Sequence, residues 1–183
     1  MQAFNVLTGV AAPLPAANVD TDVIMPKQFL KGIDRNGLDH GVFFDLRFLA
    51  DGSPDPAFIL NQPDWQNARF LLVGPNFGCG SSREQAPVAL KNAGVGMIIA
   101  NSFARIFRRN SINIGLPVML ADVGAKLQNG EVVSVDLETG EIHTAAGLLN
   151  GQPLSENVLA TIRAGGLINR VRQELNISSG RKP

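Results

Sequence analysis

A glycine-rich segment at residues 76–84 carries the side chains with the clearest chemistry in this chain. Its sequence is Asn-Phe-Gly-Cys-Gly-Ser-Ser-Arg-Glu, so the hydroxyls of Ser81 and Ser82 and the guanidinium of Arg83 follow two glycines. Glycine lets a backbone bend sharply and approach a ligand closely. Hydroxyl and guanidinium groups donate hydrogen bonds that suit oxyanions. The segment therefore predicts a site for a small carboxylate or phosphate.

The elements on either side of this segment predict a strand, a turn and the start of a helix. Residues 70–73 are an apolar run typical of a buried strand, and residues 86–93 are predicted as a helix that ends at Gly94. The first turn of a helix presents unpaired N–H groups and partial positive charge, which favour an anion. A second interpretation stays open, because Ser82 and Gln85 also have the spacing of a capping box.

Three common motifs with glycine or serine turns do not match the segment. No lysine follows the glycines as it would in a phosphate-binding P-loop, and the third glycine of a dinucleotide fingerprint is missing. A nucleophile elbow needs glycine two residues after the serine, which Ser81 and Ser82 both lack. Nucleotide binding and a serine-hydrolase triad are therefore not predicted.

The same residues resemble a known family. Residues 78–84 are similar to the active-site loop in the swivelling domain of the aconitase superfamily, and the likeness extends through residues 98–107, Asn110 and residues 115–117. Residues 18–31 and 43–48 resemble, more narrowly, the small subunits of isopropylmalate dehydratases. One departure concerns Gln85, which stands where the family usually has histidine after the Arg-Glu pair.

The resemblance implies both a fold and an activity. The expected fold is α/β, a single swivelling β/β/α domain like the aconitase C-terminal domain, over residues 1–176, with residues 177–183 as a disordered tail. The implied protein is the small subunit of a two-chain hydro-lyase that isomerises 2-isopropylmalate and 3-isopropylmalate by dehydration and rehydration in leucine biosynthesis. A related hydro-lyase acting on another substituted malate and a non-catalytic anion-binding module stay open as alternatives.

The resemblance also implies the roles of particular side chains. Ser81 is the expected general base, which takes the proton alpha to a substrate carboxylate. Asp22 is expected to orient an arginine or serine of the glycine-rich loop, and residues 29–37 are expected to form a mobile substrate-recognition loop. The side chains expected to bind substrate are Ser82, Arg83, Thr21, Asp22, Leu30 and Lys31.

The chain contains one cysteine, Cys79. Iron–sulfur clusters are held mainly by several cysteine thiolates, so this chain is expected to hold no cofactor and no metal. The [4Fe-4S] cluster that the resemblance implies is therefore expected on a partner, the large subunit. Cys79 itself is interpreted as a small residue that fills the loop, with a reactive thiol as the alternative.

Composition narrows the class further. The chain has 183 residues and a formal net charge of zero, which gives no electrostatic case for nucleic acid or an anionic membrane. No apolar run approaches the ~20 residues of a membrane-spanning helix, and the N-terminal residues lack the pattern of a signal peptide. The single cysteine suits a reducing cytoplasm, and the resemblance implies an enzyme subunit with a small-molecule substrate.

Local patterns predict the remaining elements. The two prolines in residues 11–17 indicate a turn, and Ser102 is expected to cap a helix over residues 103–110. On that helix, Arg105, Arg108 and Arg109 share a basic face, either solvated or a docking face for the partner chain. The other predicted elements are strands at 4–10, 96–100 and 116–120, a packed segment at 57–65, a hairpin at 131–143, and helices at 155–164 and 167–175 separated by Gly165–Gly166.

Overall fold

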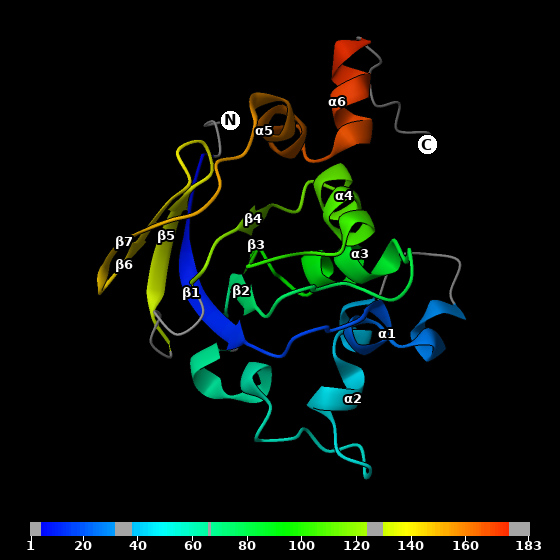
Figure 1. Cartoon of the computed structure of the whole chain (residues 1–183). Helices are drawn as coiled ribbons and strands as arrows, with labels where there is room; N and C mark the ends of the chain where they lie inside the picture. The colour runs from blue at the N-terminus through cyan, green and yellow to red at the C-terminus, as the bar shows by residue number, and fades with distance from the viewer. Residues whose placement is uncertain (1–4, 32–37, 66, 124–129, 176–183) are drawn as a thin grey trace.

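The structure is a computed structural model that describes residues 5–31, 38–65, 67–123 and 130–175. Within these residues the chain forms one mixed sheet of seven strands in the order β4-β3-β2-β1-β5-β6-β7 (Figure 1). The strands are β1 (Val6–Leu14), β2 (Phe70–Val73), β3 (Met97–Ala100), β4 (Val118–Leu120), β5 (Val132–Asp136), β6 (Glu141–Thr144) and β7 (Gly147–Asn150). The predicted strands and the predicted hairpin are confirmed, whereas β7 was not predicted.

Strand β1 joins a parallel half of the sheet to an antiparallel half. Its first part, Val6–Val10, pairs antiparallel with β5, and its second part, Ala11–Leu14, pairs parallel with β2. The predicted turn at residues 11–17 is therefore wrong, because the strand continues through Pro13. Proline lacks an N–H and is confined to positions that need no donor. Pro13 fits because the register with β5 ends at Val10, and Pro13 itself is paired with β2. The N–H that proline lacks is therefore not needed for pairing with β5.

Alternate residues of the parallel strands pack into two separate cores. Leu71 and Ile98 point to a core shared with the helices α3 (Gln85–Asn92) and α4 (Arg105–Asn113). Phe70 and Ile99 point to the opposite core, which the antiparallel strands and α5 (Glu156–Arg163) complete. Parallel strands that are covered on both faces are apolar at every position, which is why these short runs could be predicted from sequence.

The other helices are short or lie at the end of the chain. The remaining helices are α1 (Thr21–Ile24), α2 (Phe44–Arg47), α6 (Leu167–Glu174) and the 3-10 helices η1 (Lys27–Lys31), η2 (Leu38–Gly41), η3 (Ile59–Asn61) and η4 (Pro63–Trp65). The predicted break between α5 and α6 is confirmed, with positive φ angles at Gly165 and Gly166. No helix in the described parts of the chain is long and apolar enough to cross a membrane.

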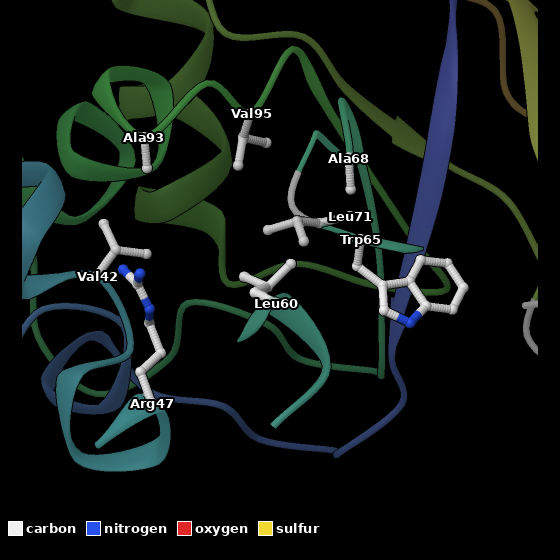
Figure 2. Close-up of a pocket in the computed structure, with 8 residues that line it drawn as sticks. All are labelled: Val42, Arg47, Leu60, Trp65, Ala68, Leu71, Ala93 and Val95. Atoms are coloured by element: carbon white, nitrogen blue, oxygen red, sulfur yellow. The ribbon is translucent and has the colours of Figure 1, made fainter. Parts of the chain in front are cut away.

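The segment that contains η3 and η4 covers one side of the sheet, as predicted. Trp65 is buried, and Leu60 packs against the same core. Between this segment and the end of α3 lies a pocket of about 90 Å³, which Figure 2 shows with the guanidinium of Arg47 turned toward Val42. None of the residues expected to act on substrate lines this pocket, so it belongs to the packing of the segment rather than to the candidate site.

The parallel half of the sheet determines where the candidate site lies. Strands β1, β2 and β3 are parallel neighbours, so their carboxyl ends meet at one edge of the sheet. In open α/β sheets, ligands bind at this edge. Strand β1 leads there into α1, β2 leads into the glycine-rich loop, and β3 leads into the segment before α4 (Figure 1).

Candidate active site

The glycine-rich loop lies beside the segment that follows β1. The N–H of Gly78 donates to the carbonyl of Val19 at 2.8 Å, and the N–H of Thr21 donates to the carbonyl of Cys79 at 2.9 Å. Asp20 and Cys79 form an isolated parallel bridge. These bonds extend the pairing of β1 and β2 beyond the strands, so the two segments are held in register at the sheet edge.

The other side of the loop is bonded to the segment that follows β3. The N–H of Ala104 donates to the carbonyl of Phe77 at 3.0 Å, and the N–H of Asn76 donates to Ser102 Oγ at 2.8 Å. The predicted capping role of Ser102 is wrong, because α4 has Ala104 as its N-cap and no side-chain capping bond. The Ser102 hydroxyl instead fixes the start of the glycine-rich loop.

Two asparagines contribute to the site although sequence reasoning gave them no role. Asn18 and Asn76 both have positive φ angles, 56° and 57°, and Asn76 Nδ2 donates to Asn18 Oδ1 at 2.9 Å. Asparagine tolerates the left-handed conformation better than most residues. In the sequence, an asparagine at the start of each turn could have indicated these left-handed positions. The contact between the two asparagines depends on the fold.

Ser81 is held by the buried side chain of Thr21. Thr21 Oγ1 and Ser81 Oγ are 2.7 Å apart, and the N–H of Ser81 lies 3.3 Å from Thr21 Oγ1. An amide N–H can only donate, so Thr21 Oγ1 accepts there. Between the two hydroxyls, either oxygen can be the donor. Thr21 is 1% exposed, whereas Ser81 is exposed. The arrangement presents the Ser81 oxygen to solvent with a buried hydroxyl behind it.

Arg83 forms an ion pair with Asp22. Arg83 Nη1 donates to Asp22 Oδ1 at 2.7 Å and to the carbonyl of Met25 at 3.0 Å. The Arg83 side chain is 11% exposed and that of Asp22 is 47% exposed. The hydrogen bond from Arg83, together with its charge, lowers the pKa of Asp22 below the usual 3.8. The structure thus places Asp22 where it was expected to act, against the arginine of the loop.

Asp20 has the structural role in this segment. Its carboxylate accepts from the N–H of Asp22 and the N–H of Val23, both at 2.8 Å, and so caps α1. That cap sets Thr21 as the first residue of α1. Asp20 therefore caps α1, and the ion pair belongs to Asp22.

The alternative in which Ser82 only caps a helix is wrong. The N-cap of α3 is Glu84 in a helical conformation, and it makes no side-chain capping bond. Gln85 is already the first residue of α3, so the Ser82–Gln85 spacing does not correspond to the cap and third helical positions. Ser82 is exposed, next to the Ser81 hydroxyl in the chain. Both hydroxyls therefore lie ahead of the helix rather than within its cap.

The expected recognition loop is described in part. Leu30 lies in η1, is half-buried and packs against the core beside α1 and α3. Lys31 is the last residue of η1. Residues 32–37 lie outside the described residues. Leu30 is only five positions after Met25, whose carbonyl accepts a hydrogen bond from Arg83.

The site on this chain does not fit a cysteine-ligated cluster. The sequence contains one cysteine, and Cys79 Sγ lies 3.4 Å from the carbonyl oxygen of Asn18 within the loop. Among the described residues, no group of three or more His, Cys, Asp or Glu side chains is placed to hold a metal ion. The groups that this chain presents are instead two hydroxyls, a guanidinium and a carboxylate.

Comparisons with known proteins agree with the fold. The Aconitase C-terminal domain family matches residues 1–122 of the chain. The crystal structure of 3-isopropylmalate dehydratase from Methanocaldococcus jannaschii superposes with a TM-score of 0.77 and 32% sequence identity, and the match covers 95% of this chain and 98% of that one. The fold class predicted from sequence is confirmed, because the chain has the domain of the aconitase C-terminal class.

Curated relatives narrow the class to one branch. The chain is 51% identical to 3-isopropylmalate dehydratase small subunit 1 of Mannheimia succiniciproducens, over 87% of this chain and 84% of the relative. It is 52% identical to small subunit 2 from Salmonella typhimurium, over 79% of this chain and 74% of the relative. The chain belongs to the family of 3-isopropylmalate dehydratase small subunits, which are subunits of a hydro-lyase of leucine biosynthesis.

Replacing Gly78 by alanine should destabilise the fold more than replacing another glycine with a similar φ. A Cβ on Gly78 would lie 2.2 Å from Phe107 Cγ, whereas a Cβ on Gly94 would meet nothing within 4 Å. We expect Gly94→Ala to cost about 1–2 kcal/mol from backbone conformation alone, and Gly78→Ala about 2–5 kcal/mol because overpacking is added. Urea unfolding followed by circular dichroism measures both, and equal costs would contradict the close contact.

The ion pair should be visible in the titration of Asp22. Its folded pKa lies below 3.8, so the pair stabilises the fold fully above that value and is lost as pH falls through the lower folded pKa. Because Asp22 is half-exposed, the gain should stay below ~1 kcal/mol. In carboxyl-detected NMR, Arg83→Gln should raise the pKa of Asp22 toward 3.8. Asp51 is the control, since Ser53 lowers its pKa and the substitution should leave it unchanged.

Proposed function

We propose that this chain works with a large subunit as a 3-isopropylmalate dehydratase that interconverts 2-isopropylmalate and 3-isopropylmalate. One observation carries the proposal: an exposed Ser81 hydroxyl lies 2.7 Å from the hydroxyl of the buried Thr21. The family membership supplies the reaction, and this pair of hydroxyls supplies a group on the chain that can move the proton.

Ser81 is the base in this proposal. The proton leaves the carbon alpha to a substrate carboxylate and goes to Ser81 Oγ, and it returns to carbon during rehydration. A serine hydroxyl is too weak a base in its ordinary state, so its alkoxide must be stabilised before the proton is taken. In this proposal the Thr21 hydroxyl donates to Ser81 Oγ for this purpose, and a donor already oriented inside the protein does not have to reorganise during the reaction.

Arg83 binds and orients a carboxylate of the substrate. Its Nη1 holds Asp22 and the Met25 carbonyl, and among the described residues its Nε and Nη2 make no hydrogen bond. That remaining edge has the planar fork that fits a carboxylate with two hydrogen bonds. Ser82 adds a hydroxyl next to Ser81. The Asp22 carboxylate keeps the guanidinium in place while the substrate exchanges.

The remaining chemistry belongs to the partner in this proposal. A [4Fe-4S] cluster, which the family implies, does not fit the single cysteine of this chain, so we assign it to the large subunit. The same single cysteine suits the reducing cytoplasm as the compartment. This chain then contributes the proton transfer and the carboxylate site, and the substrate lies between the two subunits.

Paired substitutions of Thr21 test the role of its hydroxyl. Thr21→Val keeps the branched shape and removes the donor, whereas Thr21→Ser keeps the donor. In the assembled enzyme we expect Thr21→Val to lower kcat by about 10²–10³, as for the loss of one oxyanion donor, and Thr21→Ser to retain most activity. Steady-state kinetics on 3-isopropylmalate measure both variants. Ser81→Ala should abolish turnover, and substantial activity in that variant would rule out Ser81 as the base.

Substrate choice is a separate prediction that concerns Leu30. If its side chain contacts the alkyl branch of the substrate, Leu30→Ala should change the ranking of isopropylmalate against a methyl-substituted malate by about ten- to two-hundred-fold. Gln28→Ala, an exposed position of the same 3-10 helix, is the matched control and should leave the ranking unchanged. The ratio of kcat/KM for the two substrates decides, and an equal loss on both would contradict a recognition role.

A further inference from the structure

The last helix is attached to the domain through a polar contact. Arg170 Nη1 donates to the carbonyl of Asn157 at 2.8 Å and to Thr161 Oγ1 at 3.1 Å, and both acceptors lie on α5. Arg170 is the least exposed residue of α6, and α6 contains no buried residue. A surface helix normally turns its apolar side to the core. In α6, a charged side chain makes that contact instead.

The apolar side of α6 is left facing outward. Leu167, Val171 and Leu175 are spaced four residues apart and so share one side of the helix with Ile168. All four are exposed, Ile168 to 66% and Leu175 to 62%. We call these four residues the α6 stripe. Contiguous apolar side chains of this size on a surface mark an interaction site more often than scattered ones do.

The position of α6 is fixed independently of its stripe. A Cβ on Gly115 would lie 2.7 Å from the carbonyl carbon of Gly165, and a Cβ on Gly166 would lie 2.8 Å from the carbonyl oxygen of Asn113. The start of α6 is therefore held against the end of α4 by backbone packed on backbone. Figure 1 shows α6 beside α4 and α5 at one end of the molecule. The stripe is thus presented by an anchored helix.

A pocket lies beside the stripe and includes a chain neighbour of Arg83. It measures about 200 Å³ and lies between α3, α4 and α6, with Val88, Ile114, Leu167 and Ile168 among its lining residues. Glu84 also lines this pocket. Because Glu84 follows Arg83 directly in the chain, the apolar surface begins one residue from the proposed carboxylate site.

We propose that the α6 stripe and this pocket form the docking surface for the large subunit. The inference rests on the proposed function, in which the large subunit must face Ser81 and Arg83 for the substrate to reach both chains. A protein that covers the catalytic loop and extends past Glu84 enters the pocket and then meets the stripe. The matching surface on the large subunit is a segment with apolar side chains, one of which fills the pocket.

Charge substitutions on the stripe test this surface in the assembled enzyme. The concentration of the large subunit is held constant while this chain is titrated. The measured quantity is the concentration of this chain that gives half-maximal activity. Ile168→Glu and Leu175→Glu should each raise that concentration by about ten-fold or more, as expected for interface anchors. The kcat at saturating small subunit should stay unchanged. Leu148→Glu on β7, which also replaces an exposed leucine, is the matched control and should have no effect on either value.

The outcomes separate this inference from the proposed function. Absence of binding and activity when the unmodified chain meets the large subunit would overturn both. Normal assembly with Ile168→Glu and Leu175→Glu would overturn the docking surface alone. Sedimentation of the isolated chain tests whether a second copy of this chain, rather than the large subunit, covers the stripe. If Ile168→Glu dissociates a dimer of this chain and leaves its affinity for the large subunit unchanged, the stripe is not the docking surface for the large subunit. Thermal unfolding of each variant verifies that the exposed substitutions leave the fold intact.

Discussion

The structure of the site depends on the backbone hydrogen bonds that hold the glycine-rich loop between two other segments. On one side these bonds join Gly78 and Cys79 to the segment that ends in Thr21, and on the other they join Phe77 to the segment before α4. The three segments leave parallel strands at the same edge of the sheet. Because an unpaired buried backbone group is costly, this pairing also holds the side chains that the segments carry.

Glycine is required in this loop for two different physical reasons. Gly78 combines a positive φ with backbone so close to the Phe107 ring that no side chain fits. Gly80 has a positive φ and would place a Cβ 3.2 Å from Asp20 Cβ, a tight contact between the loop and the cap of α1. The loop can therefore approach both α4 and α1 closely. That approach brings Ser81 within hydrogen-bond distance of Thr21 and lets Arg83 reach Asp22.

The proposed division of labour between two subunits rests on what this chain contains. Its site presents hydroxyls, a guanidinium and a carboxylate, which can bind an oxyanion and move a proton. A cluster bound by several thiolates needs more cysteines than the one that the sequence has. The same chain carries an anchored helix whose apolar side is turned outward. Both features support the proposal that a partner subunit completes the chemistry.

The sequence by itself determined the elements whose signals are local. The apolar runs of β2, β3 and β4, the glycine that ends α3 and the break between α5 and α6 depend on neighbouring residues, and each was predicted correctly. The family resemblance also indicated which residues to examine. It placed Thr21 and Ser81 in one site, but it did not predict the hydrogen bond between these two residues, which are sixty positions apart.

The tertiary structure decided the contacts that depend on strand order. A serine hydroxyl can cap a nearby helix or accept a hydrogen bond from a distant backbone N–H. Ser102 accepts the distant bond, because β3 places it beside Asn76. Pro13 stayed in a strand because its missing N–H is not needed where β5 no longer pairs. The sequence also did not show that the apolar side of α6 faces outward. The periodicity of the helix predicts an apolar side, but not whether the domain or a partner covers it.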